Sequence, residues 1–502
     1  MSDAVEPMVP ADPDRAPLSA DSTPPARRRT FVVVAVAALA LIGGLLDRVP
    51  RPDDDGPTAA TSLVATMPVA APPTSLSSTW FCAGGMATSA PVDGMQAEGA
   101  VAVANAGDRA LTGTVTVVPS EGEPKTVPLE VGPRSRRRFL LSEVVRAPYA
   151  SALVELDGGD VVVEHEIFGA LGISTAPCAA AASDRWHFAE GSTAREDSMR
   201  LVIFNPFPED AIVDLSFSTD QGRAVPSNLT GLVVKGGRNL IVKVEEHVRR
   251  RLNVSTTAVA RSGRIVVDRL QLRGGAVKGI SLALGAPSPG RRWYFPEGFV
   301  SDGIGERYHL YNPTGTEAQV SIELTLDEGA AEPFDLTIAP RGRITVVASE
   351  EERVPRGVGH AATVVSLNDV PVVAERSVTA TSPASRSGIS DSLGIRETAR
   401  TWVLAAGAAT DTHDEVVVLH NPSATAASAS IRGLVGGQLL DVATLQEVAL
   451  PAGRRVAVRL TDHIKRDELP LLIRASSPIV VERGVYVVGG PGIGLSAAIP
   501  LR

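Results

Sequence analysis

Four tryptophans mark a repeat that constrains the fold of this 502-residue chain more than any other feature. They lie 106, 107 and 109 residues apart, and a glycine stands five residues after each of them. A fixed period of this length is typical of tandem modules, and about 105 residues is near the usual domain size. We therefore predict four modules, numbered 1 to 4, over residues 80–185, 186–292, 293–401 and 402–502. The residues that define the repeat are Trp80, Trp186, Trp293, Trp402, Gly85, Gly191, Gly298 and Gly407.

The sequence after Trp80 reads as a series of short β-strands. Apolar and polar residues alternate over 114–118, 211–217 and 319–326, and Gly, Pro, Asn or Asp separate such runs. A period of two indicates a half-buried strand, and many such strands with turn signals between them favour a sandwich. The predicted fold class is all-β, with four tandem immunoglobulin-like β-sandwich repeats after one N-terminal transmembrane helix. The repeats can extend as a rod or close into a ring, and the pattern does not distinguish the two.

Each module carries further landmarks at matching positions. Asn-Pro pairs, typical of turns, follow an apolar strand 19–20 residues after three of the tryptophans. Each module then closes on a strand with an acid, followed by Arg in modules 2 to 4 and by His165 in module 1. Adjacent strand residues point to opposite faces, so we expect one member to be half-buried and to pair with another strand or the neighbouring module. These landmarks are Asn205, Asn312, Asn421, Glu164, Asp268, Glu375 and Glu482.

None of these landmarks predicts a catalytic residue, a metal site or a cofactor. A lone tryptophan that opens a β-module favours a core position over a ligand platform. The pairs Glu190-Gly191 and Glu297-Gly298 are interpreted as turns in which glycine supplies a positive φ angle. Glu164-His165-Glu166 is the most metal-like triplet, but strand alternation places His165 opposite the two glutamates. The sequence has no H-E-x-x-H, C-x-x-C or G-x-S-x-G motif.

The two cysteines both fall in module 1. Cys82 stands where the other modules have Phe188, Phe295 and Leu404, which indicates an inward-facing core position, and Cys178 lies near the end of the module. An oxidising compartment allows a disulfide between the module's first and last strands. Closing a loop of about 97 residues would stabilise the fold by a few kcal/mol in the chain-entropy model. The alternative is a pair of buried free thiols.

The N-terminal region predicts a membrane anchor. Residues 1–29 are expected to form a disordered cytoplasmic tail, because the first 26 hold almost no large apolar side chains. Residues 30–46 are an uncharged apolar run that as a helix spans about 25 Å of a ~30 Å hydrocarbon core. Three arginines before the run and three aspartates after it place the N-terminus in the cytoplasm. Residues 47–79, rich in Pro, Ala and Thr, are a predicted linker, and a cleaved signal peptide is the alternative to an anchor.

Taken together, the tryptophan phrases, the Asn-Pro turns and the closing acid-Arg strands resemble a known group of proteins. These are actinobacterial membrane-anchored or secreted cell-envelope proteins of unknown function, built from tandem W-Y-F-A-E-G…N-P…V-x-E-R β-modules. The resemblance covers residues 80–502 and is clearest in modules 2 and 3, whereas in module 4 Ala406 replaces the acid before Gly407. It implies an extracytoplasmic location and transfers no catalytic residue.

The predicted function is a non-enzymatic structural or interaction role in the cell envelope. The protein would be a single-pass plasma-membrane protein with its repeats outside the cell. A net charge of −9 argues against a nucleic-acid binder. The expected partners are the lipid bilayer, through residues 30–46, and a cell-wall glycan or another envelope protein. The alternative is a carbohydrate-binding accessory protein for envelope polysaccharide assembly or export.

Overall fold

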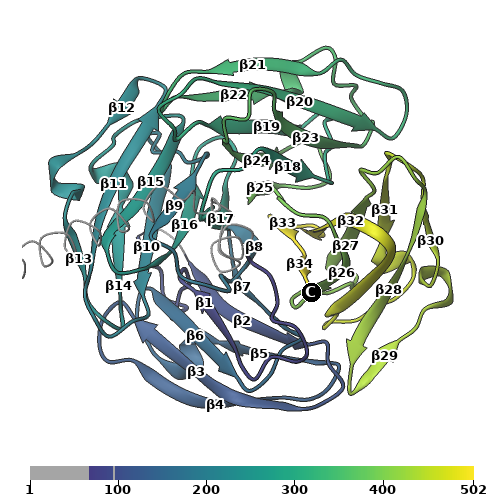
Figure 1. The fold of residues 1–502 in the computed structure, drawn as a ribbon, viewed down its shortest axis with the longest axis horizontal. Coiled ribbons are helices and arrows are strands. Elements are labelled where there is room, and N and C mark those ends of the chain that lie inside the picture. The colour runs from purple at the N-terminus through teal and green to yellow at the C-terminus, as the bar shows by residue number, and fades with distance from the viewer. Residues whose placement is uncertain (1–66, 94–95) are drawn as a thin grey trace, which may run out of the picture. The chain divides into compact units, whose positions relative to one another are not determined.

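The chain forms β-strands throughout the part that the structure describes, residues 67–93 and 96–502 of a computed structural model (Figure 1). This confirms the prediction of an all-β fold. In these residues no helix is long and apolar enough to cross a membrane. The predicted tail 1–29, the predicted transmembrane helix 30–46 and the first part of the predicted linker lie outside the described residues.

Modules 1 and 2 follow one another with matching strands. Module 1 contains β1 (Ser78–Cys82), β2 (Ala97–Asn105), β3 (Leu111–Pro119), β4 (Lys125–Val131), β5 (Ser135–Leu140), the helical turn α3 (Leu141–Val144), β6 (Ala150–Leu156), β7 (Val161–Gly169) and β8 (Gly172–Pro177). Module 2 contains β9 (Arg185–Phe188), β10 (Ser198–Asn205), β11 (Ala211–Thr219), β12 (Gly222–Ala224), η1 (Ser227–Leu229), β13 (Leu232–Val234), β14 (Arg238–Lys243), η2 (Val244–Glu246), β15 (Val254–Ser262), β16 (Val266–Arg273) and β17 (Gly279–Leu284).

Modules 3 and 4 repeat the same order. Module 3 contains β18 (Arg292–Phe295), β19 (Ile304–Tyr311), β20 (Ala318–Leu326), β21 (Phe334–Ile338), β22 (Arg343–Val347), η3 (Ala348–Glu350), β23 (His360–Ser366), β24 (Val373–Ala380) and β25 (Gly388–Leu393). Module 4 contains β26 (Ala399–Leu404), β27 (His413–His420), β28 (Ala427–Val435), β29 (Gln438–Leu440), η4 (Ala443–Leu445), β30 (Val448–Leu450), β31 (Arg455–Arg459), η5 (Leu460–Asp462), β32 (Leu471–Val487), β33 (Ile493–Ala497) and β34 (Ile499–Pro500). The first strand of each module begins one to three residues before its tryptophan.

Each module places its strands in two antiparallel sheets. In module 1 the orders are β1-β6-β3-β4 and β5-β2-β7-β8, and in module 3 they are β18-β23-β20-β21 and β22-β19-β24-β25. Module 2 has the same order, with its fourth strand divided into β12 and β13. In module 4 the sixth and seventh strands are continuous as β32, which pairs with β26 and β28 at one end and with β27 and β33 at the other.

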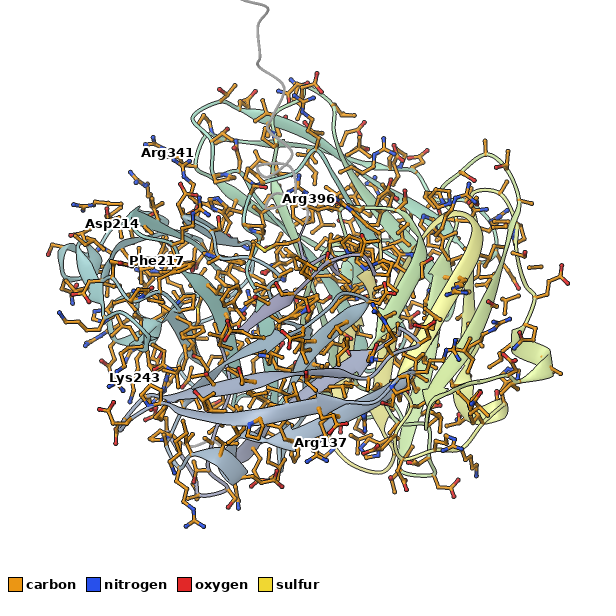
Figure 2. All side chains as sticks on the ribbon, turned by 60° about the horizontal axis from the view of Figure 1, so that its bottom comes forward. Arg137, Asp214, Phe217, Lys243, Arg341 and Arg396 are labelled. Carbon is orange, nitrogen blue, oxygen red and sulfur yellow. A yellow bond between two sulfur atoms is a disulfide. The ribbon has the colours of Figure 1, made fainter. Side chains whose placement is uncertain are left out.

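The tryptophans lie in the core between the two sheets of each module. Trp80 is 1% exposed and the other three are 0% exposed. In module 2, Trp186 donates from Nε1 to the carbonyl of Ile265 at 2.7 Å, so its polar atom is satisfied inside the core. Charged side chains cover the outside (Figure 2): Arg341 is exposed, whereas Phe217 is 1% exposed and belongs to the core of module 2.

The landmark asparagines hold the turn that follows the second strand. Asn205 donates from Nδ2 to the carbonyls of Glu209 and Val234, at 2.7 and 3.0 Å, and its Oδ1 accepts from the N–H of Phe207. One side-chain amide therefore bonds three backbone groups of a turn, where a neighbouring strand does not supply partners. Asn105, Asn312 and Asn421 make the equivalent bonds in their modules.

The four modules close into a ring rather than a rod. Their eighth strands, β8, β17, β25 and β33, lie next to one another around the centre, and β33 returns to β8 (Figure 1). Serine side chains link successive inner strands, because Ser174 Oγ accepts from the N–H of Leu282 and Ser390 Oγ accepts from the N–H of Leu495, each at 2.9 Å. The ring follows from contacts between modules, which a period along the sequence does not contain.

The last part of the predicted linker is packed rather than free. Met67, Val69 and Ala70 are at most 9% exposed. The N–H of Ala70 donates to the carbonyl of Pro500 in module 4 at 3.0 Å, and the carbonyl of Ala71 accepts from Asp160 in module 1 at 2.9 Å. The linker prediction is therefore wrong for residues 67–71, because these apolar side chains bury themselves at the meeting point of the first and last modules.

Candidate functional site

The acid on the seventh strand of each module reaches into the preceding module. We call the contact between modules 2 and 3 junction 2–3, and name the other three in the same way. At junction 2–3, Glu375 on β24 accepts from the N–H of Glu190 at 2.6 Å and from Arg269 on β16 at 2.7 Å. Both ionic side chains are 0% exposed. Arg269 also donates to the carbonyl of Glu190, and its guanidinium lies 5.5 Å from the ring centroid of Phe188.

Junction 3–4 repeats this arrangement one module further on. Glu482 on β32 accepts from the N–H of Glu297 at 2.9 Å and from the guanidinium of Arg376 on β24. The Arg376 guanidinium also lies 5.4 Å from the ring centroid of Phe295. Each contact thus joins the acid of one module to the tryptophan phrase and the arginine of the module before it.

Junction 4–1 closes the ring with the same chemistry. Glu164 on β7 accepts from the N–H groups of Ala405 and Ala406, at 2.8 and 2.6 Å, and from Arg483 at 3.1 Å. The Arg483 and Glu164 side chains are both 0% exposed. This pair connects residues 319 positions apart, so it depends wholly on the closed ring.

The expectation that one member of each acid-Arg pair is half-buried is wrong, because both members are buried. Glu375 and Arg376 are both 0% exposed, although they are neighbours on β24. Alternation sends them to opposite sides, where Glu375 meets module 2 and Arg376 meets module 4. Pairing with a neighbouring module, the other half of the expectation, is what the structure has.

Junction 1–2 has a histidine where the other three junctions have an arginine. His165 stands at the arginine position, and its Nδ1 lies 2.8 Å from the carbonyl oxygen of Gly84. Asp268 accepts from the N–H of Gly84 at 2.5 Å, and His165 Nε2 lies 3.7 Å from Asp268 Oδ2. Burial raises the pKa of Asp268 to about 8 and lowers the pKa of His165 to about 4. Burial therefore favours the neutral form of both groups.

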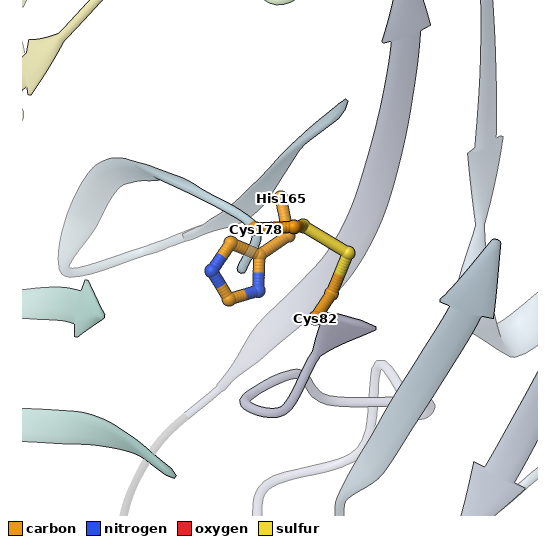
Figure 3. A group of neighbouring side chains, drawn as sticks. All are labelled: Cys82, His165 and Cys178. Carbon is orange, nitrogen blue, oxygen red and sulfur yellow. A yellow bond between two sulfur atoms is a disulfide. The ribbon is translucent and has the colours of Figure 1, made fainter. Parts of the chain in front are cut away.

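A disulfide lies beside His165 in this junction (Figure 3). Cys82 and Cys178 are bonded, with their Cα atoms 4.6 Å apart. Their sulfurs and one nitrogen of His165 lie within 4.8 Å of one another, which is close enough for metal ligands. Thiolates bind metals, and sulfurs bonded to each other are not thiolates. The disulfide instead fills the space that phenylalanine occupies under the arginines of junctions 2–3 and 3–4.

The repeated glycines serve close packing more than turn formation. Gly191 has a φ of 158°, but Gly298 is not among the described glycines with a positive φ, so the turn interpretation is wrong for Gly298. A Cβ on Gly298 would lie 2.5 Å from the ring of His360, and a Cβ on Gly85 would lie 2.5 Å from Leu141. These positions exclude larger residues because neighbouring side chains approach the backbone.

A groove of about 640 Å³ lies at junction 4–1. Module 1 lines it with two arginines from β5 and with side chains from β7, and module 4 lines it with residues of the tryptophan phrase, β32 and the segment before β32. Arg138 donates to Glu166 at 2.6 Å and lies 5.0 Å from the ring centroid of Phe168. Lining residues include Arg136, Arg138, Glu166, Phe168, His413 and Glu468. Neither periodicity nor motif spacing predicts this groove, and its one sequence signal is the alanine at position 406.

One family model matches part of the chain. A family of unknown function (DUF5719) matches residues 169–392, which contain module 2 and most of module 3. This agrees with the expectation of an uncharacterised family. No curated protein matches the chain.

Among solved structures, the crystal structure of Thermotoga maritima 1070 is 18% identical, with a TM-score of 0.20, over 21% of this chain and 94% of that chain. A Streptomyces avermitilis alpha-L-rhamnosidase complexed with L-rhamnose is 8% identical, with a TM-score of 0.13, over 77% of this chain and 54% of that chain. At these TM-scores neither likeness supports an inference about this protein.

Proposed function

We propose that this chain is a non-enzymatic interaction protein of the cell envelope whose modules form a rigid ring. The observation that carries the proposal is the burial of its ionic groups at the junctions. Arg269, Arg376 and Arg483 are 0% exposed, and each is bonded to a carboxylate of the next module. Groups that act on a substrate must reach it, whereas these groups reach only the neighbouring module. Their arrangement suits a scaffold that keeps surfaces in fixed positions.

We also propose that the modules are immunoglobulin-like sandwiches and that the chain belongs to the actinobacterial envelope group. In each module the second strand pairs with the fifth and the third with the sixth, which are also neighbours in immunoglobulin sandwiches. This supports an immunoglobulin-like classification. The tandem landmarks support membership of the actinobacterial envelope group that the sequence resembles.

An extracytoplasmic location is part of the proposal. The bond between Cys82 and Cys178 supports it, because disulfides persist in oxidising compartments. The apolar run 30–46 supports a single membrane anchor with the N-terminus in the cytoplasm. The ring would then be carried outside the plasma membrane.

A second candidate function is carbohydrate binding in envelope polysaccharide assembly or export. The groove at junction 4–1 favours it, since about 640 Å³ lies within the ~300–1,000 Å³ range of ligand pockets. Its lining combines an aromatic ring, Phe168, with charged hydrogen-bonding groups, which is a composition that can contact both the apolar and the polar faces of a sugar.

Co-sedimentation of the purified chain with isolated cell-wall polysaccharide tests the two candidates. Saturable pelleting that free polysaccharide competes away would support carbohydrate binding. Absence of pelleting, together with specific crosslinks to an envelope protein in intact cells, would support a protein-interaction role. Time-dependent cleavage of the polysaccharide by the chain would overturn the non-enzymatic proposal.

A further inference from the structure

Two matching positions occur at every junction, and their residues differ from one junction to the next. The first position is four residues after the tryptophan. The second lies on the fifth strand of the next module, paired with the residue just before the landmark asparagine. From junction 1–2 to junction 4–1 the residues at these two positions are Gly84 and Asn239, Glu190 and Arg343, Glu297 and Arg455, and Ala406 and Arg136.

Junction 3–4 shows what this pair of positions does when both charges are present. Arg455 donates from Nη1 to Glu297 Oε2 at 3.0 Å, and Tyr486 donates from its hydroxyl to Glu297 Oε1 at 3.2 Å. The arginine side chain is 5% exposed and the glutamate 12%. Arg455 Nε also donates to Asp327 at 2.9 Å. The guanidinium therefore meets two carboxylates of the module before it, those of Glu297 and Asp327.

At junctions 1–2 and 2–3 the two positions make no ion pair with each other among the described residues. At junction 1–2 neither charge is present, and Asn239 donates from Nδ2 to the carbonyl of Val118 at 2.9 Å. At junction 2–3 both are present: Glu190 accepts from Arg273 at 2.5 Å, and Arg343 donates to Ser255 at 3.0 Å. At these two junctions the glutamate and the arginine are thus either both present or both absent.

Junction 4–1 keeps the arginine and loses the acid. Arg136 has a side chain that is 5% exposed, and the matching position of module 4 holds Ala406 instead of a glutamate. Its contacts are a hydrogen bond from Nη1 to the carbonyl of Gly407 at 3.4 Å and an ion pair from Nη2 to Glu468 at 3.1 Å. Glu468 is 65% exposed, so this pair is weakened by solvent. Arg136 Nε has no hydrogen-bond partner among the described residues.

The groove borders the position that lacks the carboxylate, because Arg136 and Gly407, the residue after Ala406, both line it. Phe168 stands four residues after the closing acid, where module 4 has Tyr486, so the hydroxyl that holds Glu297 is also absent here. Nearby carboxyl groups replace the carboxylate only in part: Glu468, which is 65% exposed, is ion-paired with Arg136, and Asp467 also lines the groove. Arg138 and Glu166 are bonded to each other, and burial raises the pKa of Glu415, beneath Gly407, to about 8, which favours its neutral form.

We propose that the groove at junction 4–1 binds the carboxylate of an acidic saccharide, with Arg136 as the group that anchors it. A guanidinium matches a carboxylate with two parallel N–H donors, and burial strengthens such a bond. The groove has room for the sugar that carries the acid, and Phe168 and Ile173 offer apolar contact to its C–H groups. This inference rests on the second proposed function, carbohydrate binding, and names its ligand class.

Titration calorimetry with an oligogalacturonate and with its carboxyl-reduced, neutral counterpart tests the inference. The chain should bind the acidic oligosaccharide at least tenfold more tightly, and added salt should narrow the difference. Arg136→Gln should weaken acidic binding at least tenfold. Arg137→Gln is the matched control, because Arg137 is the next residue on β5 and is exposed (Figure 2), and it should leave the affinity unchanged.

Ala406→Glu tests the same site without removing the arginine. The new carboxylate should meet Arg136 as Glu297 meets Arg455, abolish binding of the oligogalacturonate and raise the melting temperature. Ala406→Gln, of equal size but without charge, should not raise the melting temperature. Equal affinity for the acidic and the neutral oligosaccharide, or binding undiminished by Ala406→Glu, would overturn the carboxylate site and leave carbohydrate binding intact. Failure of the chain to pellet with any wall polysaccharide would instead reject the proposed function.

Discussion

Arg269 and Glu375 lie 106 residues apart in the sequence and meet at 2.7 Å, from Nη1 to Oε2, where neither side chain is exposed. A buried ion pair of this kind is costly to form, because both ions lose their hydration, and it is more costly to leave half-made. The pair therefore discriminates strongly between the docked and the undocked arrangement of modules 2 and 3.

Removal of one member of this pair should destabilise the chain far more than removal of both. Arg269→Met leaves Glu375 buried without its cation, and we expect a loss of about 3–5 kcal/mol. In the double variant Arg269→Met/Glu375→Met, most of that loss should be recovered. Urea unfolding followed by tryptophan fluorescence gives both values. A double variant no more stable than the single one would show that the pair itself contributes most of the stability.

The disulfide should contribute to the stability of module 1. It closes 96 residues of chain, and the entropy of that loop predicts a contribution of about 2–5 kcal/mol. Reduction with dithiothreitol should lower the melting temperature of the natural chain. A Cys82→Ala/Cys178→Ala variant should start at the lower temperature and respond no further to the reductant. If dithiothreitol also lowers the melting temperature of the cysteine-free variant, its effect on the natural chain does not come from this disulfide.

Much of the module architecture could be predicted from sequence, because its causes repeat along the chain. The tryptophan period, the period-two strands and the landmark asparagines all reflect contacts within one module. Alternation also places Glu375 and Arg376 on opposite faces. Alternation does not show which module covers each face of the strand, so the burial of both residues could not be predicted.

The ring and the groove depend on relations between modules. A small rotation from one module to the next decides between a rod and a ring, and no residue pattern reports that angle. The groove at junction 4–1 has a signal in Ala406, the one alanine at a position where modules 2 and 3 have glutamate. The role of this alanine can be interpreted only once the structure shows that Arg136 occupies the matching position of module 1.

Stability should fall as the pH rises from about 6.5 to 8. Burial raises the pKa of Asp268 and of Glu415 to about 8 and contributes to a rise for Asp391 to about 7. The folded state therefore binds protons that the unfolded state has released, and this contribution is lost as pH rises through the folded pKa values. Buried histidines such as His165, with a pKa near 4, act in the opposite direction, but only below about pH 6.5.

Glu415→Gln should flatten that decline. In module 3 the matching acid, Glu306, is bonded to His360 at 2.7 Å and to Tyr308 at 3.0 Å, whereas both Glu415 oxygens have no hydrogen-bond partner among the described residues. Glutamine is neutral at every pH in the window, so the variant should lose less stability between pH 6.5 and 8 than the natural chain. Melting temperatures across this range measure it, and parallel curves for the two proteins would contradict the assignment.

Junction 4–1 should be the weakest point of the ring. Modules 1 to 4 are joined in sequence by the chain itself at the other three junctions, but module 4 meets module 1 only through contacts such as Arg483 to Glu164 and Ala70 to Pro500. Arg483→Gln leaves Glu164 buried without its cation, so we expect the ring to open there and the radius of gyration from small-angle scattering to increase. Arg376→Gln makes the same change at junction 3–4, where the chain still holds the modules together, and should increase it less. A larger expansion for Arg376→Gln than for Arg483→Gln would contradict this prediction. It would mean that covalent continuity is not what distinguishes the two junctions.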